Sequence, residues 1–299
     1  MSEHYVSRYE ATLNGISMAS IDPAVAVLDV QYEKPKYKRN LFQLANRNGA
    51  RPGTRYKDRA AVTILFEIHE QNIFKRQNIC QDIIAWAKDG GDLRINDRPG
   101  QKLICVCDDF PSVESVRNWT NEMTITFAAY ECPYWQEVTP TVIECEYSSR
   151  SATTLEDAFE EYSMTIPGNA PYTLLEMKID NFTNIGAYVG VQNVSRDDGL
   201  FEQRGAIYGG TNRRQDAIIL EYDENMIMQY YIYEYDTVQE VYYKRDEQGW
   251  LVGVDEVRLN CGKTNTIKFR HGQLNTSADP VTFTPRACTV TFTARGLWE

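Results

Sequence analysis

The alternation of hydrophobic and polar residues changes its period within residues 71–109, which predicts a helix followed by a β-hairpin. The first part has helical spacing, with apolar residues at Ile73, Cys80, Ile83, Ile84 and Ala87, and with Ile79 and Trp86 widening the stripe. Gly90 and Gly91 follow at once, and glycine just past a helix ends it because it adopts a positive φ at little cost. Two short alternating runs around the turn 96–100 then predict strands. We expect the helix to lie on a sheet, with Trp86 as a buried anchor.

The rest of the first half predicts further strands by the same alternation. They cover Tyr9–Leu13 before the turn Asn14-Gly15, Val25–Tyr32, Ala61–His69 and Glu122–Tyr130. With the hairpin, about six strands accompany one helix, which predicts a β-sandwich with the helix packed on it.

The order of these pieces resembles the distal tail protein (Dit) family of long-tailed, siphovirus-type bacteriophages. The resemblance is carried by a helix ending at Trp86, the glycine turn, Leu93-Arg94-Ile95 and the turn Asp97-Arg98-Pro99-Gly100. Near the start, Leu13-Asn14-Gly15-Ile16 matches the family's short strand, Asn-Gly turn and return strand. The resemblance covers residues 1–135, and beyond them it extends to the architecture only.

Residues 33–59 are basic and lack a clear period, so we predict one long loop. The loop holds nine Lys and Arg against Glu33 and Asp58. It is either a solvated surface loop or an arm that docks on an acidic neighbour. The resemblance implies the arm, because a long loop at this place belts the adjacent subunit of a ring in the family. The candidate interface residues are Lys36, Lys38, Arg39, Leu41, Phe42, Arg47, Arg51 and Arg55.

Residues 140–171 combine a Ser/Thr-rich run, an acidic run and a Pro-rich segment, which predicts a boundary. Beyond it, many short alternating runs separated by turn signals predict a second β-sandwich. The candidate strands are Leu174–Asp180, Ala187–Val191, Ala217–Tyr222, Met226–Tyr235, Val238–Tyr243, Trp250–Val254, Thr266–Phe269 and Cys288–Phe292.

The resemblance implies that this second sandwich is similar to a galectin or a carbohydrate-binding module. Gly262 to Ile267 and Ile179-Asp180-Asn181 resemble the family's strand entry and strand end there. We therefore expect a mainly β protein of two domains. Residues 1–135 would be a ring-forming tail domain, and residues 136–299 a galectin-like β-sandwich.

Composition and charge exclude several classes of protein. The 299 residues carry a net charge of −11, which argues against a duplex-binding protein, because such a protein needs a basic face. No window resembles a transmembrane helix or a signal peptide, so we expect no membrane association. The seven Cys are odd in number and lack C-x-x-C spacing, and we expect them to be reduced.

Candidate catalytic and metal-binding motifs have simpler explanations, and we expect no enzyme activity, cofactor or metal. Gly262-Lys263-Thr264 lacks the upstream glycine of a phosphate loop. The three His stand alone. The turn residues Asp89, Asp92, Asp97, Asp108 and Asp109 fit capping better than a calcium site. Glu160-Glu161 could be drawn as a glycosidase pair, although such pairs are usually solvated.

Tyrosines mark one candidate partner face in the second half. Tyr231, Tyr233 and Tyr235 alternate along one predicted strand and share a face. Packing is the simpler reading, and stacking on a glycan or on a protein partner is the alternative.

The resemblance implies a structural role in a phage virion. The chain would form a homo-hexameric ring hub at the tail tip, joining the tail tube protein to the tail-associated or baseplate hub protein and to a receptor-binding protein. DNA would pass through an acidic channel without specific binding. Assembly would take place in the bacterial host cytoplasm. The alternatives are a lectin-like module for host glycans and a glycan hydrolase.

Overall fold

The computed structural model divides the chain into two compact units. The first unit comprises residues 1–138 with Trp298 and Glu299, and the second comprises residues 139–297. The described residues are 7–43, 50–111, 122–148, 152, 154–180, 187–196, 200–204, 213–222, 228–236, 238–246, 250–251, 256–275 and 282–299. Within 39–56, 187, 200–204, 213–218, 228–236, 242–246, 250–251 and 274–275, only the backbone of these residues is described.

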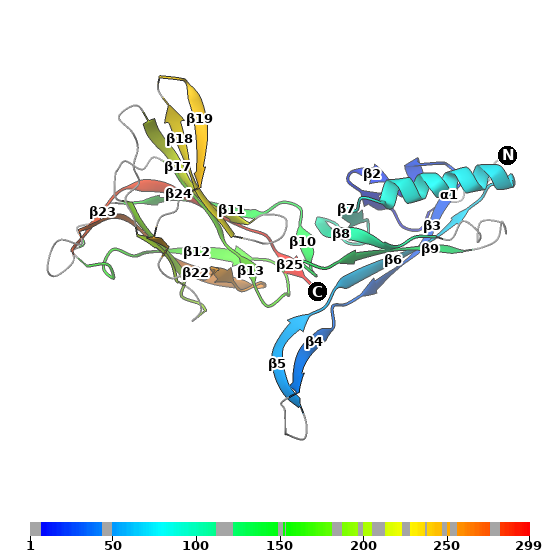
Figure 1. The fold of residues 1–299 in the computed structure, drawn as a ribbon, viewed down its shortest axis with the longest axis horizontal. Helices are drawn as coiled ribbons and strands as arrows, with labels where there is room; N and C mark the ends of the chain where they lie inside the picture. The colour runs from blue at the N-terminus through cyan, green and yellow to red at the C-terminus, as the bar shows by residue number, and fades with distance from the viewer. Residues whose placement is uncertain are drawn as a thin grey trace. The chain divides into compact units, whose positions relative to one another are not determined.

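The first unit is built on one nine-stranded sheet with the helix α1 (Ile73–Ala87) packed on it (Figure 1). The order β2-β1-β7-β8-β9-β6-β3 runs through the sheet, with β10 paired to β8 and β25 paired to β10. The bounds are β1 Ala11–Leu13, β2 Ile16–Ser17, β3 Val25–Glu33, β6 Ala60–Ile68, β7 Gly91–Ile95, β8 Gln101–Asp109, β9 Met123–Ala129, β10 Trp135–Glu137 and β25 Leu297–Trp298, with a 3-10 turn η1 at Met18–Ser20. A separate pair, β4 (Tyr37–Gln43) and β5 (Ala50–Lys57), lies between β3 and β6 in the sequence.

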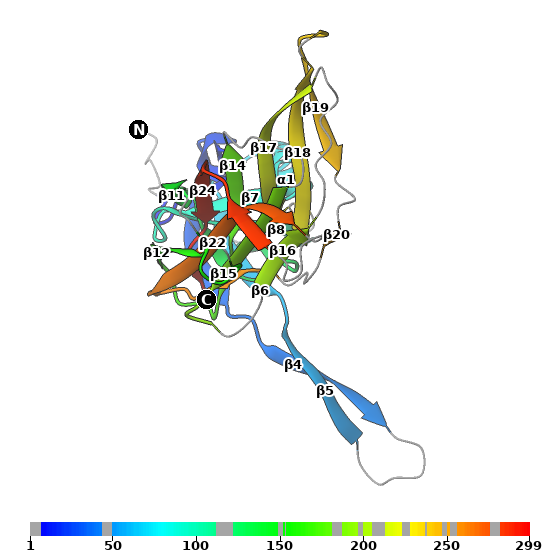
Figure 2. The ribbon, with the colours of Figure 1, turned by 90° about the vertical axis from the view of Figure 1, so that its left-hand side faces the viewer.

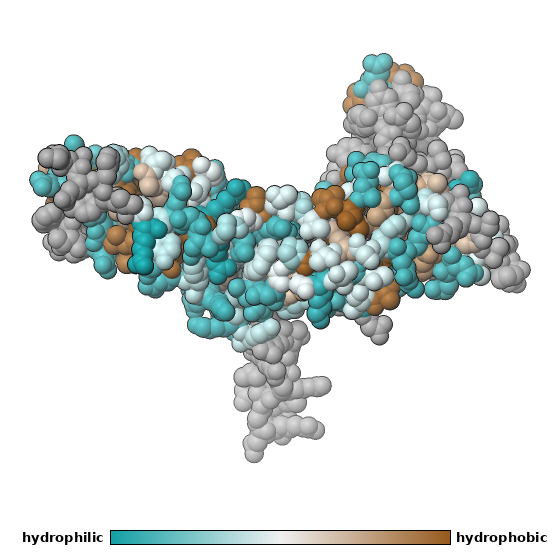
Figure 3. Space-filling view, turned by 180° about the vertical axis from the view of Figure 1, so that it is seen from behind, coloured by the Kyte–Doolittle hydropathy of each residue, from teal (hydrophilic) through white to brown (hydrophobic). Residues whose placement is uncertain are grey.

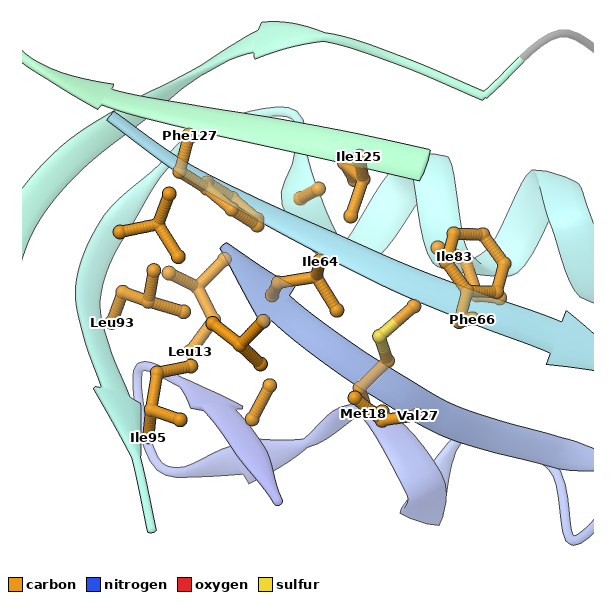
Figure 4. Packing of buried hydrophobic residues seen from close by; sticks show 14 of the residues in the cluster. Leu13, Met18, Val27, Ile64, Phe66, Ile83, Leu93, Ile95, Ile125 and Phe127 are labelled. Atoms are coloured by element: carbon orange, nitrogen blue, oxygen red, sulfur yellow. The ribbon is translucent and has the colours of Figure 1, made fainter. Parts of the chain in front are cut away.

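Strand β8 joins two halves of this sheet around the core. Its first half pairs with β7, where Leu103 lies opposite Leu93, and its second half pairs with β9, where Cys107 lies opposite Phe127. Figure 4 shows Leu13 and Leu93 from one half pointing toward Ile64 and Phe127 from the other. All four are fully buried, and burying such a side chain stabilises a fold by roughly 1.5–3 kcal/mol. The two predicted sandwich layers thus belong to one continuous sheet.

Helix α1 begins and ends where the sequence predicts. The Asn72 side chain caps it by accepting from the backbone N–H groups of Phe74 and Lys75, at 3.0 and 3.3 Å. Its buried face is Arg76, Ile79, Cys80, Ile83 and Ala87. Ile73, which the apolar stripe included, is instead 37% exposed, because the first turn extends past the edge of the core.

Asn14 connects the first hairpin turn to the glycines that end the helix. Its side chain donates to the Gly90 carbonyl at 2.9 Å and accepts from the Asp92 N–H at 2.9 Å. Its own φ is +51°, a left-handed conformation that Asn tolerates better than most residues. Gly91 has a φ of +128°, and a Cβ there would lie 2.1 Å from the Asn14 Oδ1. The Asn14-Gly15 turn and the Gly90-Gly91 helix stop are therefore explained by one contact, which joins segments that lie 76 residues apart.

The turn 96–100 is fixed by aromatic residues from distant strands. Tyr32 of β3 donates to Asp97 at 2.5 Å. The Arg98 guanidinium lies 4.5 Å from the Tyr32 ring and 4.8 Å from the Trp135 ring, and these two rings meet edge to face. Burial first, and then the Asp97 carboxylate, raises the pKa of Tyr32 well above its usual value. This turn therefore ties β3 to β10 across the sheet.

The second unit contains two six-stranded antiparallel sheets (Figure 2). One has the order β11-β24-β14-β17-β18-β19, with bounds Thr141–Tyr147, Cys288–Ala294, Glu176–Asp180, Arg213–Tyr222, Met228–Asp236 and Val241–Asp246. The other has the order β12-β22-β15-β16-β20, with β23 beside β22, and the bounds are Glu160–Ile166, Lys263–Asn275, Ala187–Asn193, Leu200–Arg204, Trp250–Leu251 and Thr282–Pro285. A short pair, β13 (Thr173–Leu174) and β21 (Arg258–Leu259), completes the unit.

Aromatic side chains pack these two sheets face to face. Phe269 of β22 meets Tyr147 and Phe292 of the other sheet edge to face, with ring centroids 5.4 and 5.7 Å apart. Asn265 is fully buried and closes the turn before β22 by accepting from the Asn260 N–H and donating to the Asn260 carbonyl. This contact explains the strand-entry motif at 262–267.

The prediction of a mainly β protein is confirmed, and two local predictions are wrong. Residues 140–171, predicted as a boundary, directly follow the division of the chain after Val138 and contain strands β11 and β12. The long loop 33–59 contains strands β4 and β5. Trp86 is only half-buried, because it lies at the margin of the core, where its Nε1 donates to the Ile16 carbonyl at 3.0 Å and its ring meets Phe127 edge to face.

No cysteine of the chain forms a disulfide, and five of the seven are buried. Burial raises the pKa of the Cys105 thiol to about 12, which keeps it protonated. No helix in the described part of the chain is long and apolar enough to span a membrane.

The contact between Asn14 and Gly91 predicts that substitutions at these two positions have non-additive effects on the free energy of unfolding. Asn14→Gly keeps the left-handed conformation and removes two hydrogen bonds, and we expect it to cost about 1–2 kcal/mol of unfolding free energy. Gly91→Ala adds strain and a clash and should cost more than this. The double variant should cost less than the sum, because the clash disappears with the Asn14 side chain. Additive costs in chemical denaturation would contradict the contact. Gly100→Ala, with φ +75° and open space, is the control for strain alone.

Half-burial predicts an intermediate cost at Trp86. We expect Trp86→Phe to lose about 0.5–1.5 kcal/mol, the contribution of one hydrogen bond, since the edge contact with Phe127 remains possible. Phe127→Ala in the core should cost about 3–5 kcal/mol. If Trp86→Phe instead lowered the free energy of unfolding by about 3–5 kcal/mol in denaturant titrations, as expected for a core residue, the Trp86 side chain would be part of the core.

Candidate functional site: the basic ribbon

The basic segment 33–59 is a two-stranded ribbon that extends beyond the sheet of the first unit (Figures 1 and 2). Strands β4 and β5 are antiparallel, with Tyr37 opposite Lys57 and Leu41 opposite Pro52. The sequence showed no alternation here because a ribbon without a core on either side needs no apolar face. Residues 44–49, which include Arg47, lie outside the described residues.

The ribbon continues a hairpin that begins in the sheet. Strands β3 and β6 are paired as far as Glu33 opposite Ala61. The Asp58 N–H then donates to the Lys36 carbonyl at 2.8 Å, which bridges to the first ribbon pair, Tyr37 and Lys57. The base of the ribbon is thereby fixed by the register of the sheet.

At this base, both acidic residues of the segment form ion pairs with lysines of the same segment. Lys36 pairs with Glu33 at 2.6 Å, and Lys38 pairs with Asp58. A hydrogen bond from Lys36 lowers the pKa of Glu33, and one from Lys38 lowers the pKa of Asp58. Both pairs are largely exposed, so they neutralise the base of the ribbon more than they stabilise it.

Lys57 is enclosed at the point where the ribbon meets the sheet. Its side chain is 8% exposed and pairs with Glu299. Its ammonium group lies 5.1 Å from the centre of the Tyr37 ring and 4.7 Å from that of Tyr134. Burial opposes the charge, but the contacts with Glu299 and Tyr134 outweigh it and raise the pKa of Lys57. Sequence reasoning missed this cluster, because Lys57 and Glu299 are 242 positions apart and no local pattern links them.

A second network lies beside the base. Arg59 pairs with Asp108 and donates to the Tyr130 hydroxyl at 3.1 Å, and Tyr130 donates to Asp108 at 2.6 Å. Four of the nine basic residues of the segment thus have partners within the chain, and two of them, Lys36 and Lys38, were predicted interface residues.

Beyond the base, the backbone register brings like charges together. Arg39 lies directly opposite Arg55, and Phe42 lies opposite Arg51. No acidic residue occurs between Lys34 and Lys57. Like charges directly opposite each other destabilise a strand pair, so the distal ribbon gains from acidic groups on another surface. This part holds the predicted residues Arg39, Leu41, Phe42, Arg51 and Arg55.

One face of the molecule, as far as its residues are described, favours a polar mode of contact. On the side of the molecule shown in Figure 3, hydrophobic residues lie in small separate groups within a mainly hydrophilic surface. Since no broad apolar area is visible there, charge becomes the main feature that distinguishes one surface from another.

The predicted tyrosine face lies in strand β18 of the second unit. The register pairs Tyr231 with Ile219 and Tyr233 with Ala217, while the intervening Ile232 pairs with Ile218. Ile218 in turn lies opposite the buried Ile179 of β14. Positions 231, 233 and 235 therefore lie on the sheet face that points away from the other sheet.

The remaining candidate motifs do not form reactive sites. Glu160 is 9% exposed and accepts from Ser148 and Tyr162, whereas Glu161 lies on the opposite side of β12 near Lys268. The two carboxylates therefore do not face a common substrate. Among the described residues, no three His, Cys, Asp or Glu side chains gather in a way that could hold a metal ion.

Comparison with known proteins finds similarity in structure and not in sequence. No protein-family model matches the chain, and no curated protein matches its sequence. The fold is similar to that of the SPP1 Dit protein, described as a paradigm of the hub adsorption apparatus of phages that infect Gram-positive bacteria. The TM-score is 0.54 and the identity 9%, over 96% of this chain and 98% of that chain.

Two structures of the phage P2 baseplate in its activated conformation, with calcium and with strontium, also match. Their TM-scores are 0.39 and 0.36, at 11% identity, over 88% of this chain and 97% of theirs. These scores are too low to show a common fold. The resemblance to distal tail proteins is therefore confirmed as a likeness of fold, through the SPP1 Dit protein.

Enclosure of Lys57 predicts that this residue orders the base of the ribbon. Lys57→Met keeps most of the side-chain volume and removes the charge, and we expect a loss of about 1–3 kcal/mol because Glu299 keeps a charge without its partner. Hydrogen exchange at the Asp58 amide should accelerate as the base of the ribbon loosens. Lys36→Met, in an exposed pair, is the control and should change stability by about 0–1 kcal/mol. Equal effects of the two substitutions would contradict a special role for Lys57.

Proposed function

We propose that this chain is a distal tail protein, a structural component of a bacteriophage tail tip. The proposal is supported by the likeness in fold to the SPP1 Dit protein over 96% of the chain and by the sequence motifs that Asn14, Gly91 and Arg98 now explain. On this proposal the protein acts by assembly and carries out no catalysis. Its location is the virion tail tip, after assembly in the host cytoplasm.

The observation that carries the mechanism is the basic ribbon. Its base is neutralised within the chain, while its distal part places Arg39 opposite Arg55 and contains no acid. The chain as a whole has a charge of −11, so a second copy offers the acidic surface that the ribbon lacks. Phe42, which lies opposite Arg51 near the distal end of β4, supplies an apolar anchor, because aromatic contacts dominate interface energy. We therefore infer that the ribbon is an inter-subunit arm.

A closed assembly follows from this kind of contact. When an arm engages a different surface on the next copy, the repeated contact closes into a ring if the rotation allows. The proposed ring is a homo-hexamer formed by the first unit, between the tail tube protein and the baseplate hub protein. Acidic residues along its channel would let DNA pass, because phosphates find few cations there.

The second unit offers a further candidate function, a lectin-like module for host surface glycans. The observation in its favour is the register that places positions 231, 233 and 235 on the outward face of the sheet. Tyrosine rings at alternate strand positions can stack on sugar rings. Binding of the whole chain to a glycan array, lost in Tyr231→Ala and Tyr233→Ala, would support this function. No binding above background would leave the outward face as a protein-contact surface.

The arm predicts that two ribbon variants fail to assemble. Phe42→Asp and the double reversal Arg51→Glu with Arg55→Glu should each reduce the native mass from an oligomer to a single chain of 34.4 kDa. The matched controls are Phe74→Asp, at an exposed helix residue, and the double reversal Lys75→Glu with Arg94→Glu, at exposed positions of the same unit. If both ribbon variants assemble like the unmodified chain at the same concentration, the ribbon is not the arm.

A further inference from the structure

The turn between β1 and β2 brings together the two groups of an intramolecular reaction. Leu13 pairs with Ile16, so Asn14 and Gly15 are the two residues of the turn, and both are exposed. The backbone nitrogen that follows an asparagine can attack the Cγ of its side-chain amide. Glycine in this next position hinders the attack least, and no other part of the described chain lies within 4 Å of the place that a Gly15 Cβ would take.

We propose that Asn14 is a site of spontaneous deamidation and that its contact with Gly90 and Asp92 controls the reaction. The Gly15 nitrogen loses its proton to solvent and forms a bond to the Asn14 Cγ. The Cγ–Nδ2 bond then breaks, Nδ2 takes up a proton and leaves as ammonia, and a five-membered succinimide ring remains. Water opens this ring at either carbonyl, which gives aspartate or isoaspartate at position 14. Water is the only co-reactant, in keeping with the thermal lability of asparagine in proteins.

The folded contact holds the Asn14 amide at both ends. Its Nδ2 donates to the Gly90 carbonyl and its Oδ1 accepts from the Asp92 N–H, each at 2.9 Å. The amide also lies directly against the Gly91 backbone, since its Oδ1 is only 2.1 Å from the position of a Gly91 Cβ. Ring closure requires the amide to rotate toward the Gly15 nitrogen, and rotation breaks both hydrogen bonds.

The left-handed backbone at position 14 is a second restraint on the reaction. The succinimide ring needs Cβ and the Gly15 nitrogen on the same side of the Cα–C bond, whereas a left-handed residue places them on nearly opposite sides. Conversion therefore proceeds from a state in which the turn has opened locally. The two hydrogen bonds alone should make the reaction at least about tenfold slower in the folded chain than in the unfolded one.

Conversion keeps the contact open once it has taken place. A carboxylate at position 14 still accepts from the Asp92 N–H, but it has no proton to donate to the Gly90 carbonyl, so two acceptors face each other. Isoaspartate also lengthens the backbone by one carbon, which disturbs the pairing of Leu13 with Ile16. The reaction therefore records, in one direction only, how long each chain has spent with this turn detached from the turn before β7.

Peptide mass spectrometry of the full-length chain tests the proposal. The chain is incubated in mildly alkaline buffer, once folded and once in denaturant, and is then cleaved with trypsin. Peptide 9–36 contains Asn14 as its single asparagine, so its conversion is read directly. We expect aspartate and isoaspartate at position 14 in both samples, formed at least about tenfold more slowly in the folded chain. Equal rates in the two samples would overturn the inference.

A second asparagine of the same chain is the internal control for the chemistry. Asn72 is also exposed, but the branched side chain of Ile73 hinders attack by the following nitrogen. In denaturant, Asn72 should therefore convert far more slowly than Asn14. Equal conversion of the two asparagines in denaturant would contradict the role given to Gly15.

Variants show whether the contact is the gate. Gly91→Ala displaces the Asn14 side chain, so the folded variant should convert Asn14 several-fold faster than the unmodified chain. Gly100→Ala, also at a positive φ but in open space, should leave the rate unchanged. Asn14→Asp, which is one reaction product, should accelerate hydrogen exchange at the Asn96 amide, which donates to the Glu10 carbonyl at the other end of β1. An unchanged rate in Gly91→Ala, or unchanged exchange in Asn14→Asp, would overturn the inference. If Gly91→Ala does not fold, the comparison of folded and denatured chain and the exchange in Asn14→Asp still decide it.

Discussion

The contact of the Asn14 side chain with Gly90 and Asp92 is the constraint on which the first unit depends. It joins the turn after β1 to the turn before β7, and β1 pairs with β7 from Leu13 opposite Leu93 onward. That pairing fixes the register of β7, β7 fixes the first half of β8, and the second half of β8 fixes β9 and β6. The register then continues through β3 into the ribbon. The Asn14 amide therefore fixes one end of a continuous series of paired strands, and the buried faces of these strands carry the register onward.

The elements that the sequence predicted well are those with a buried face and a defined stop. Helix α1 has a buried stripe from Ile79 to Ala87, an Asn72 cap and a Gly90 end, and each of these leaves a local signal. Strand β6 alternates strictly because one of its faces packs on the core. The predicted type and approximate position of such elements agree with the structure.

The elements that the sequence missed lack that local signal. The ribbon strands have no buried face, so their alternation is absent, and the segment looked like a loop. Strands β11 and β12 lie at the edges of their sheets, next to polar runs that suggested a boundary. The half-burial of Trp86 and the enclosure of Lys57 depend on residues 70 and 242 positions away, which no window of sequence contains. Composition did indicate a basic segment in an acidic chain, but it did not indicate which of the basic residues form ion pairs within the chain.

The chain passes between its two units twice, after Val138 and again before Trp298, and the strands at these two crossings, β10 and β25, are paired in one sheet. The second unit is thus an insertion whose two ends return to the same place in the first. A different domain could be inserted at the same two points without changing the strands that form the rest of the first unit.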